Sequence, residues 1–324
     1  MSRLYALNTV AILVLVVSVI FPSIHSYGEY DGECWVVSRG DTIYKLLSNG
    51  NADPSIIPGL TQAQAAEVDP KRGIVWISVS AAHAVFRYDP ASADPNTAFK
   101  TISNITGARS ISINPGDGTA WIGGLDVVKK ISADGNQILA TITGVHEPEV
   151  AVNPSNGSCW VTDSRGTVTR YDANGAAVAT GQSVLKEPKF VAVNPKTGNA
   201  WVADSQASVL VKLSPVGQEL LRITDIPKPT SPEVHYQDGS VWLVSSASML
   251  IKLSPDGEKI IEVPAGMAIL SISVDGRDGG VWVADQLGST FQGGVTKFSA
   301  SGQKLFENPI PMPSYVSVGN WAGE

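Results

Sequence analysis

Histidine, glutamate and tyrosine side chains stand at or beside the ends of short apolar runs in this sequence, and these residue types could carry chemistry. A histidine beside a carboxylate can move protons or hold a metal ion. Three or four oxygen or nitrogen donors that converge on one point can bind a divalent cation. The residues expected to bind a metal are Glu67, Glu149, Glu233 and His235. The residues expected to contact a ligand are His83, Arg109, His146, Glu149, Lys186, His235, Tyr315 and Phe291.

The element that must position these side chains is a repeat marked by tryptophan. Seven tryptophans recur at spacings of 39 to 45 residues, at Trp35, Trp76, Trp121, Trp160, Trp201, Trp242 and Trp282. A repeat of this length, built from short apolar runs and turn formers, is typical of a β-propeller with one four-stranded blade per repeat. We therefore predict an all-β, seven-bladed propeller, with a six-bladed ring as the alternative.

Each repeat contains four short apolar runs that read as strands. In the clearest copy the runs are 190–193, 201–203, 209–213 and 219–223. They are rich in β-branched residues and bounded by turns such as Asn194-Pro195 and Pro215-Val216-Gly217. Runs this short are typical of strands rather than helices.

The two ends of the chain are expected to complete one blade together. The first repeat begins at its second strand, Cys34-Trp35-Val36-Val37, with no inner strand before it. Residues 313–318 match an inner strand, and no further strand of a repeat follows them. Pairing these two segments would close the ring and leave no open sheet edge. We predict this closure, and we expect truncation of either end to be costly.

The candidate ligand residues are expected in loops at one mouth of the ring. The loops that enter the inner strands, and those between the second and third strands, gather on one face of a propeller. His83, His146 and His235 belong to the second, fourth and sixth blades, so no two are on adjacent blades. Phe291 lies in a glycine-rich insertion, and such added loops on a rigid scaffold often contact partners.

Two other sets of residues have structural explanations. Asp163, Asp204 and Asp285 each follow a tryptophan by three residues and could form part of a cation-binding ring, but the other blades lack the carboxylate. Aspartate at the start of a turn also accepts backbone hydrogen bonds, which favours turn capping. Cys34 and Cys159 occupy a slot that holds small apolar residues elsewhere. We therefore expect them to be buried free thiols on different sides of the ring.

The repeats resemble a known superfamily. The unit from Trp201 to Gln218 resembles the repeats of NHL-type and streptogramin-lyase-like propellers, as do the units that start at Trp160, Trp242 and Trp282. The resemblance covers about residues 33–319. It implies the propeller fold, and the members include binding modules, sensor ectodomains and a few enzymes.

The resemblance does not extend to lyase chemistry. Virginiamycin B lyases, which share this repeat style, combine an inner-strand histidine, a glutamate three residues after the blade tryptophan and a second histidine near Mg²⁺. Here that carboxylate position holds Asp163, Asp204 or Asp285, in blades without an inner-strand histidine. The inner-strand histidine His235 is followed by Ser245 at that position. The lyase catalytic residues are thus absent.

The N-terminus and the composition bear on location and partners. Arg3, an apolar stretch over 10–21 and a small residue at Ser26 match a secretory signal peptide of residues 1–26, with a retained anchor as the alternative. Residues 27–324 then form one propeller domain. The formal charge is −7, without a basic run, which disfavours nucleic acid as a partner. We expect a secreted, extracellular or periplasmic monomer with no stable membrane insertion.

Two functions remain open from the sequence. The first is a non-catalytic binding module that holds a protein or glycan partner through its funnel face or loops. The second is a metal-dependent lactonase or lyase with Ca²⁺ or Mg²⁺ at the central channel. The missing catalytic triad favours the binding module over the enzyme.

Overall fold

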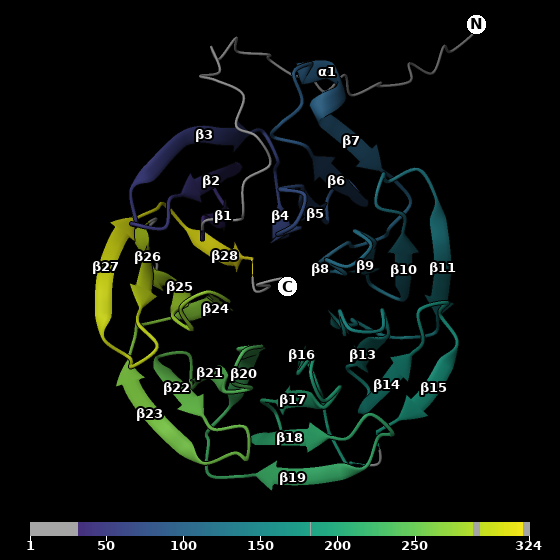
Figure 1. The fold of residues 1–324 in the computed structure, drawn as a ribbon, viewed down its shortest axis with the longest axis vertical. Coiled ribbons are helices and arrows are strands. Elements are labelled where there is room, and N and C mark those ends of the chain that lie inside the picture. Colours follow the sequence, from purple (N-terminus) through teal and green to yellow (C-terminus); the bar gives the residue numbers. More distant parts are fainter. Residues whose placement is uncertain (1–31, 182, 288–291, 320–324) are drawn as a thin grey trace, which may run out of the picture.

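The computed structural model describes residues 32–181, 183–287 and 292–319, and these residues form seven four-stranded antiparallel sheets in a ring (Figure 1). The predicted seven-bladed propeller is confirmed, and the six-bladed alternative is excluded. The predicted signal peptide and Phe291 lie outside the described residues. In the described part, the one helix is the short α1 (Pro95–Ala98), which lies in the second blade, and no helix is long and apolar enough to span a membrane.

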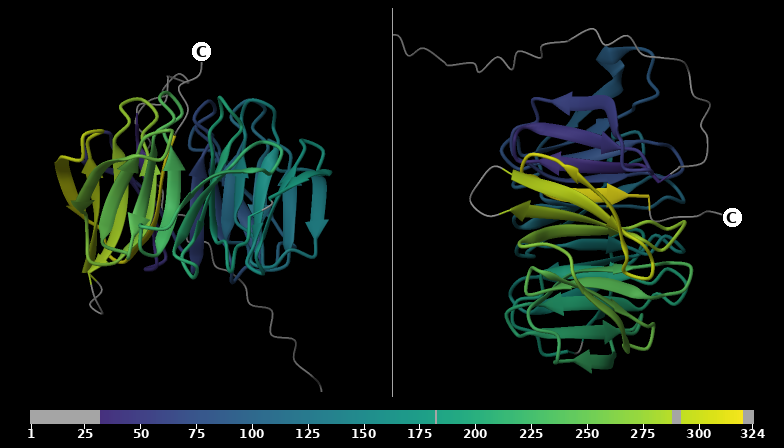
Figure 2. Two further views of the ribbon diagram at one scale, coloured as in Figure 1. Left: turned by 90° about the horizontal axis from the view of Figure 1, so that it is seen from below. Right: turned by 90° about the vertical axis from the view of Figure 1, so that its left-hand side faces the viewer.

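Each blade runs from an inner strand at the ring axis to an outer strand at the rim. From inside to outside, blade 1 contains β28 (Pro313–Val318), β1 (Cys34–Ser38), β2 (Thr42–Leu46) and β3 (Ala52–Pro58), and blade 2 contains β4 (Ala63–Val68), β5 (Val75–Val79), β6 (Ala84–Tyr88) and β7 (Phe99–Ile102). In the same order, blade 3 contains β8 (Ser110–Ile113), β9 (Ala120–Gly123), β10 (Val127–Ile131) and β11 (Ile138–Thr143), blade 4 contains β12 (Val150–Val152), β13 (Cys159–Asp163), β14 (Thr167–Tyr171) and β15 (Ala177–Thr180), and blade 5 contains β16 (Phe190–Val193), β17 (Ala200–Asp204), β18 (Val209–Leu213) and β19 (Glu219–Ile223). Blade 6 contains β20 (Pro229–Val234), β21 (Val241–Ser245), β22 (Met249–Leu253) and β23 (Lys259–Pro264), and blade 7 contains β24 (Ile269–Val274), β25 (Val281–Leu287), β26 (Gln292–Phe298) and β27 (Lys304–Pro309). The side views show that the strands run between two faces formed by turns and loops (Figure 2).

The predicted ring closure is confirmed. β28 pairs with β1 in antiparallel register, with Cys34 opposite Val318 and Val36 opposite Val316. The amide of Arg39 adds a hydrogen bond of 3.0 Å to the carbonyl oxygen of Met312. The last strand of the chain is therefore the inner strand of the first blade.

The turn between the two inner strands repeats around the ring. Its first side chain, such as Asp69 or Asn114, accepts a hydrogen bond of 3.0 Å from the amide two residues later. The turn ends at a glycine with positive φ, for example 67° at Gly73 and 77° at Gly118. Glycine adopts this conformation without a steric penalty, which explains the Asx-Pro-x-x-Gly pattern of several repeats.

The tryptophans fill the interfaces between blades, and each is paired with a cation. All seven are buried, and each lies directly opposite a lysine or arginine on the third strand. The Nζ atom of Lys252 lies 5.3 Å from the Trp242 ring centroid and donates to the carbonyl of Ala300 in the next blade at 3.1 Å. Lys130 and Lys212 do the same toward Ala173 and Pro255, both at 2.8 Å. These cations therefore join successive blades as well as covering the indole rings.

Cys34 and Cys159 are buried free thiols, as predicted. Burial raises the pKa of the Cys159 thiol and that of the Cys34 thiol. Both residues therefore behave as small apolar side chains rather than as nucleophiles.

Candidate ligand-binding channel

Strand register places one inner-strand residue of every blade opposite the blade tryptophan. We call this the tryptophan-paired position, and in blades 1 to 7 it holds Ser317, Glu67, Ser112, Ala151, Ala192, Glu233 and Ser273. Side chains two residues apart on a strand point to the same side. The residues two positions earlier therefore form a second tier, which includes Ser110, Glu149, Phe190, Ser271 and Tyr315.

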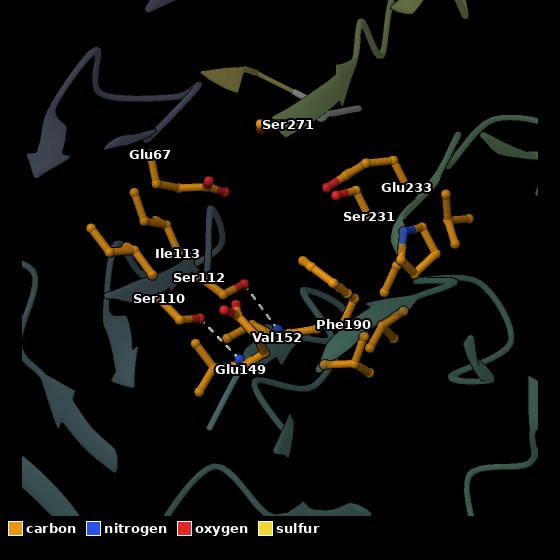
Figure 3. A pocket seen from close by; sticks show the side chains of 18 of the residues that line it. Glu67, Ser110, Ser112, Ile113, Glu149, Val152, Phe190, Ser231, Glu233 and Ser271 are labelled. Carbon is orange, nitrogen blue, oxygen red and sulfur yellow. Dashed lines mark hydrogen bonds between the residues drawn. The ribbon is translucent and has the colours of Figure 1, made fainter. Parts of the chain in front are cut away.

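Residues from both tiers line a cavity of about 350 Å³ between the inner strands. Glu67, Glu149, Glu233, Phe190 and Tyr315 all line it, from five different blades. In the close view, Glu67 and Glu233 point toward each other from opposite sides, and Glu149 approaches from a third side (Figure 3). The volume falls within the range of pockets that hold small ligands.

Serines of two blades connect the inner strands around this cavity. The hydroxyl of Ser110 accepts a hydrogen bond of 3.1 Å from the amide of Val150, and that of Ser112 accepts one of 3.0 Å from Val152 (Figure 3). Ser273 of blade 7 accepts a 3.0 Å bond from the amide of Val318 in blade 1. These hydroxyls satisfy backbone donors at the edges of the inner strands, so they have a structural role.

The glutamates have a different electrostatic state from ordinary surface carboxylates. Their carboxyl groups are enclosed by the ring, although each residue keeps some open surface toward the cavity. Burial, together with the charge of Glu233, raises the pKa of Glu67 to about 8. Burial raises the pKa of Glu233 to about 8 as well. Both groups can therefore hold a proton near neutral pH, because burial disfavours the charged form.

Glu149 and Tyr315 share this environment, and burial raises the pKa of each. Burial raises the pKa of Glu149, while a hydrogen bond with Ser110 and the charge of Arg109 oppose the rise. Burial raises the pKa of Tyr315 well above its usual value, and the three glutamates raise it further. Tyr315 therefore stays a neutral phenol that can donate a hydrogen bond.

Arg109 is the one lysine or arginine among the described residues that line the cavity. Its guanidinium lies 3.4 Å from the carboxylate of Glu147, in the loop that enters β12. One arginine shared with Glu147 does not balance the three channel glutamates. The channel is therefore acidic when its carboxyl groups are ionised.

The predicted ligand residues divide into those at the cavity and those away from it. Arg109, Glu149 and Tyr315 line the cavity, whereas His83, His146 and Lys186 lie in loops outside its lining. His83 Nδ1 accepts a hydrogen bond of 3.2 Å from the amide of Gly107. His146 Nδ1 lies 2.9 Å from a carboxylate oxygen of Asp126. Both histidines contact the neighbouring blade's loop.

His235 lies on the opposite face of the ring from His83 and His146, so the expectation that all three stand in the loops of one mouth is wrong for His235. It follows β20 and occupies the turn before β21, where blades 2, 3, 4, 5 and 7 have Asp69, Asn114, Asn153, Asn194 and Asp275. Its Nδ1 is 3.0 Å from Asp238, and its Nε2 is 3.4 Å from the carbonyl oxygen of Gly276. The ring is buried in this turn and does not line the cavity.

The four residues expected to bind a metal do not form one group. Glu67, Glu149 and Glu233 share the cavity, but His235 does not. Within residues 32–181, 183–287 and 292–319, no three histidine, cysteine, aspartate or glutamate side chains are placed to hold one metal ion.

Asp204 and Asp285 cap loops rather than forming a cation-binding ring. Asp204 accepts hydrogen bonds from the amides of Lys186 and Glu187, at 2.5 and 3.0 Å. Asp285 accepts from Met267 and Ala268, at 3.0 and 2.7 Å. These carboxylates hold the loop that enters the inner strand of the same blade.

Several channel residues were not predicted from the sequence, namely Ser110, Ser112, Phe190, Ser231 and Ser271. The available signal was the pairing of each inner strand with its tryptophan strand. Counting back two residues from that pairing would have placed Ser110, Phe190, Ser231 and Ser271, and Ser112 is itself the tryptophan-paired residue of its blade.

Several solved structures share this fold. A functionally unknown protein from Desulfotomaculum acetoxidans has a TM-score of 0.74 at 13% identity, with 89% of this chain and 98% of that chain covered. The dihydro-heme d1 dehydrogenase NirN has a TM-score of 0.65 at 11% identity, with 91% of this chain and 77% of that chain covered. A chain of the mitotic checkpoint complex has a TM-score of 0.66 at 12% identity, with 98% of this chain and 92% of that chain covered. No protein-family model and no curated protein match the sequence. The molecule is thus a seven-bladed β-propeller, and neighbours this distant in sequence bear on its fold alone.

Proposed function

We propose that this protein is a binding module and that the axial channel is its ligand site. The observation that supports this most directly is the cavity of about 350 Å³, into which Glu67, Glu149 and Glu233 project from three blades. Buried polar groups are normally paired by the fold itself. Carboxyl groups directed into a cavity are instead available to a ligand.

Binding fits the residues better than catalysis does. A serine nucleophile needs a base within hydrogen-bond reach. Ser110 and Ser112 accept backbone amides, and neither His83, His146 nor His235 lines the cavity. The channel therefore lacks a serine–histidine pair among the described residues.

The sequence resemblance and the predicted signal peptide support a setting for this module. We place it among NHL-type, streptogramin-lyase-like propellers and assign it to a secreted, extracellular or periplasmic monomer. Its partner is a protein or glycan that presents one group to the channel mouth. The loops around the mouth would contact the rest of that partner.

Defined ligand arrays test this proposal. The purified protein is applied to glycan and peptide arrays, and each hit is measured again in solution with Glu233→Lys and Glu262→Lys. Glu262 lies on the outer strand β23, where it pairs with Lys259 at 2.6 Å, so it serves as the matched control. Loss of binding in Glu233→Lys alone supports the channel site. Hits that survive this substitution, or arrays without hits, would contradict the proposal.

The second candidate is a hydrolase or lyase that uses channel carboxyls as acid and base. The observation in its favour is that the pKa values of Glu67 and Glu233 are both raised to about 8, near the operating range of a general acid or base. Mass spectrometry of each array hit after incubation tests for turnover. Parallel incubations with EDTA, Ca²⁺ or Mg²⁺ test the metal-dependent form. Unchanged ligand in every incubation would argue for the binding module.

A further inference from the structure

We propose that the channel ligand is an organic cation with two or more ammonium groups joined by a carbon chain, as in a polyamine. This inference rests on the proposed function, because it names the chemistry of that same site. It follows from the arrangement of the carboxyl groups, the apolar walls between them and the unpaired state of one glutamate.

The three carboxyl groups approach the cavity from blades 2, 4 and 6. Glu67 and Glu149 each have a serine partner, Ser317 and Ser110 respectively. The Glu233 carboxyl receives no hydrogen bond and no ion pair from the described residues, although it is buried deeply enough to raise its pKa to about 8. A carboxyl group that faces a cavity without a protein donor is free to accept hydrogen bonds from a ligand.

The arrangement suits a molecule larger than a metal ion. The glutamates are not placed to hold one ion together, so several separate positive groups match them better than a single charge. Phe190 and Tyr315 lie on the cavity wall between the acidic groups. Aromatic rings attract organic ammonium groups, and they also contact methylene carbons.

The charge facing the cavity is one-sided once the carboxyl groups ionise. The titratable groups that line it are Glu67, Glu149, Glu233, Tyr236, Tyr315 and Arg109. Arg109 lies 3.4 Å from Glu147, and Tyr315 is neutral. An incoming ammonium group would therefore meet net negative charge, and it would favour ionisation of the two glutamates that hold protons near pH 7.

Binding should consequently release protons. At pH 7, Glu67 and Glu233 are mainly protonated in the free protein, since the pKa of each is about 8. Each ammonium–carboxylate pair that forms lowers the pKa of its glutamate. Affinity should then rise as the pH increases from 6 toward 8, and it should level off above that value, until the amines lose their own protons.

Isothermal titration calorimetry with spermidine and 1,4-diaminobutane is the direct test. The uncharged control is 1,4-butanediol, and MgCl₂ and CaCl₂ are titrated separately. Repeating the titration at pH 7 in buffers of different ionisation enthalpy counts the released protons. We expect saturable binding of the amines at one site, proton release and no binding of the diol. Tetralysine and a glucosamine oligomer then show whether the ammonium groups come from a peptide or a sugar.

The variants locate the site. Glu233→Gln and Glu67→Gln should each weaken spermidine binding by at least about tenfold, because each removes one charged partner inside the ring. Glu262→Gln on the rim should change it less than about twofold, because exposed pairs contribute little. Far-ultraviolet circular dichroism and melting curves establish that each variant is folded.

The outcomes distinguish failure of the polyamine assignment from failure of the proposed function as a binding module. Equal binding of spermidine by all variants, tight binding of Ca²⁺ or Mg²⁺ without the amines, or no binding of any cation would overturn the polyamine assignment. The proposed function would still stand if an uncharged array ligand bound and Glu233→Lys abolished that binding. Both would fall if no ligand responded to the channel substitutions.

Discussion

The tryptophan-paired position has two different uses in the ring. In blade 7 it holds Ser273, whose hydroxyl accepts the amide of Val318 in the next blade at 3.0 Å. In blades 2 and 6 it holds Glu67 and Glu233, whose carboxyl groups extend into the axial cavity. The inner-strand residue pairs with the blade tryptophan in all three blades. The hydroxyl of Ser273 accepts a backbone hydrogen bond, whereas the carboxyl groups of Glu67 and Glu233 face the cavity. The repeated scaffold therefore points to candidate ligand-facing positions, namely the copies whose polar atoms extend into the cavity instead of accepting a backbone amide.

The largest effect should come from removing β28, because this strand both closes the ring and contributes Tyr315 to the cavity lining. Deleting the chain from Pro313 onward removes Ser317 and Tyr315, leaves β1 without its inner partner and uncovers the buried side chains of the closing interface. We expect an insoluble or non-cooperatively melting protein, measured by circular dichroism and calorimetry. Adding a peptide of residues 313–324 should restore part of the transition. A soluble truncated protein with a sharp melt would contradict this account of closure.

The next largest effect should be a pH dependence that belongs to the glutamates alone. The pKa values of Glu67 and Glu233 lie near 8 in the folded protein, against about 4.5 for an ordinary glutamate. Between these values the folded state binds more protons than the unfolded state. The free energy of unfolding should therefore fall as the pH rises from about 4.5 to about 8. The destabilisation is complete above about 8 and absent below 4.5.

The double variant Glu67→Gln/Glu233→Gln isolates this contribution. Its unfolding free energy, measured in urea from pH 5 to 9, should lose less with rising pH than that of the unaltered protein. All other titrating groups are common to the two proteins, so the difference between the curves reports the pair. Parallel curves would mean that the channel glutamates titrate normally.

Replacing a serine with a structural role should lower the free energy of unfolding at every pH, in contrast to the pH-dependent effect of the glutamates. Ser273→Ala leaves the buried amide of Val318 without its acceptor, so we expect a loss of about 1–3 kcal/mol in unfolding free energy with little dependence on pH. Ser301, an exposed serine of the outer turn in the same blade, provides the control Ser301→Ala. Equal urea midpoints for the two variants would show that water replaces the hydroxyl.

The sequence was sufficient to predict the ring and most of the acidic site. The tryptophan period counts the blades, and the missing first inner strand predicts the closure by residues 313–318. Glu67, Glu149, Glu233 and Tyr315 stand on or beside inner strands, so their approach to the axis follows from the repeat. These features depend on local patterns, which a single sequence carries.

The remaining features depend on how neighbouring blades meet. To predict the face on which His235 lies, it must be aligned with Asp69 and Asn114 in the turn between the two inner strands. This alignment is difficult to see in the sequence, because histidine is not a typical turn-forming residue. The roles of Ser110 and Ser112 depend on how the inner strand of blade 4 is aligned with that of blade 3, since this alignment brings the amides of Val150 and Val152 to the two hydroxyls. Such contacts join residues about 40 positions apart, so they depend on tertiary register rather than on periodicity.

The smallest effect should come from replacing single lysines. A buried lysine that contacts a blade tryptophan is compared with an exposed lysine on the rim of the ring. Lys252 is buried over Trp242 and donates to the carbonyl of Ala300, whereas Lys259 is exposed and pairs only with Glu262 among the described residues. Lys252→Met keeps the apolar stem and removes the charge, so it should cost about 1–2 kcal/mol in unfolding free energy. Lys259→Met should change it by less than about 0.5 kcal/mol. Urea titrations of both variants compare them directly. Equal costs would mean that the cation–tryptophan pairs do not join the blades, and the division between structural and ligand-facing polar groups would then be limited to the inner strands.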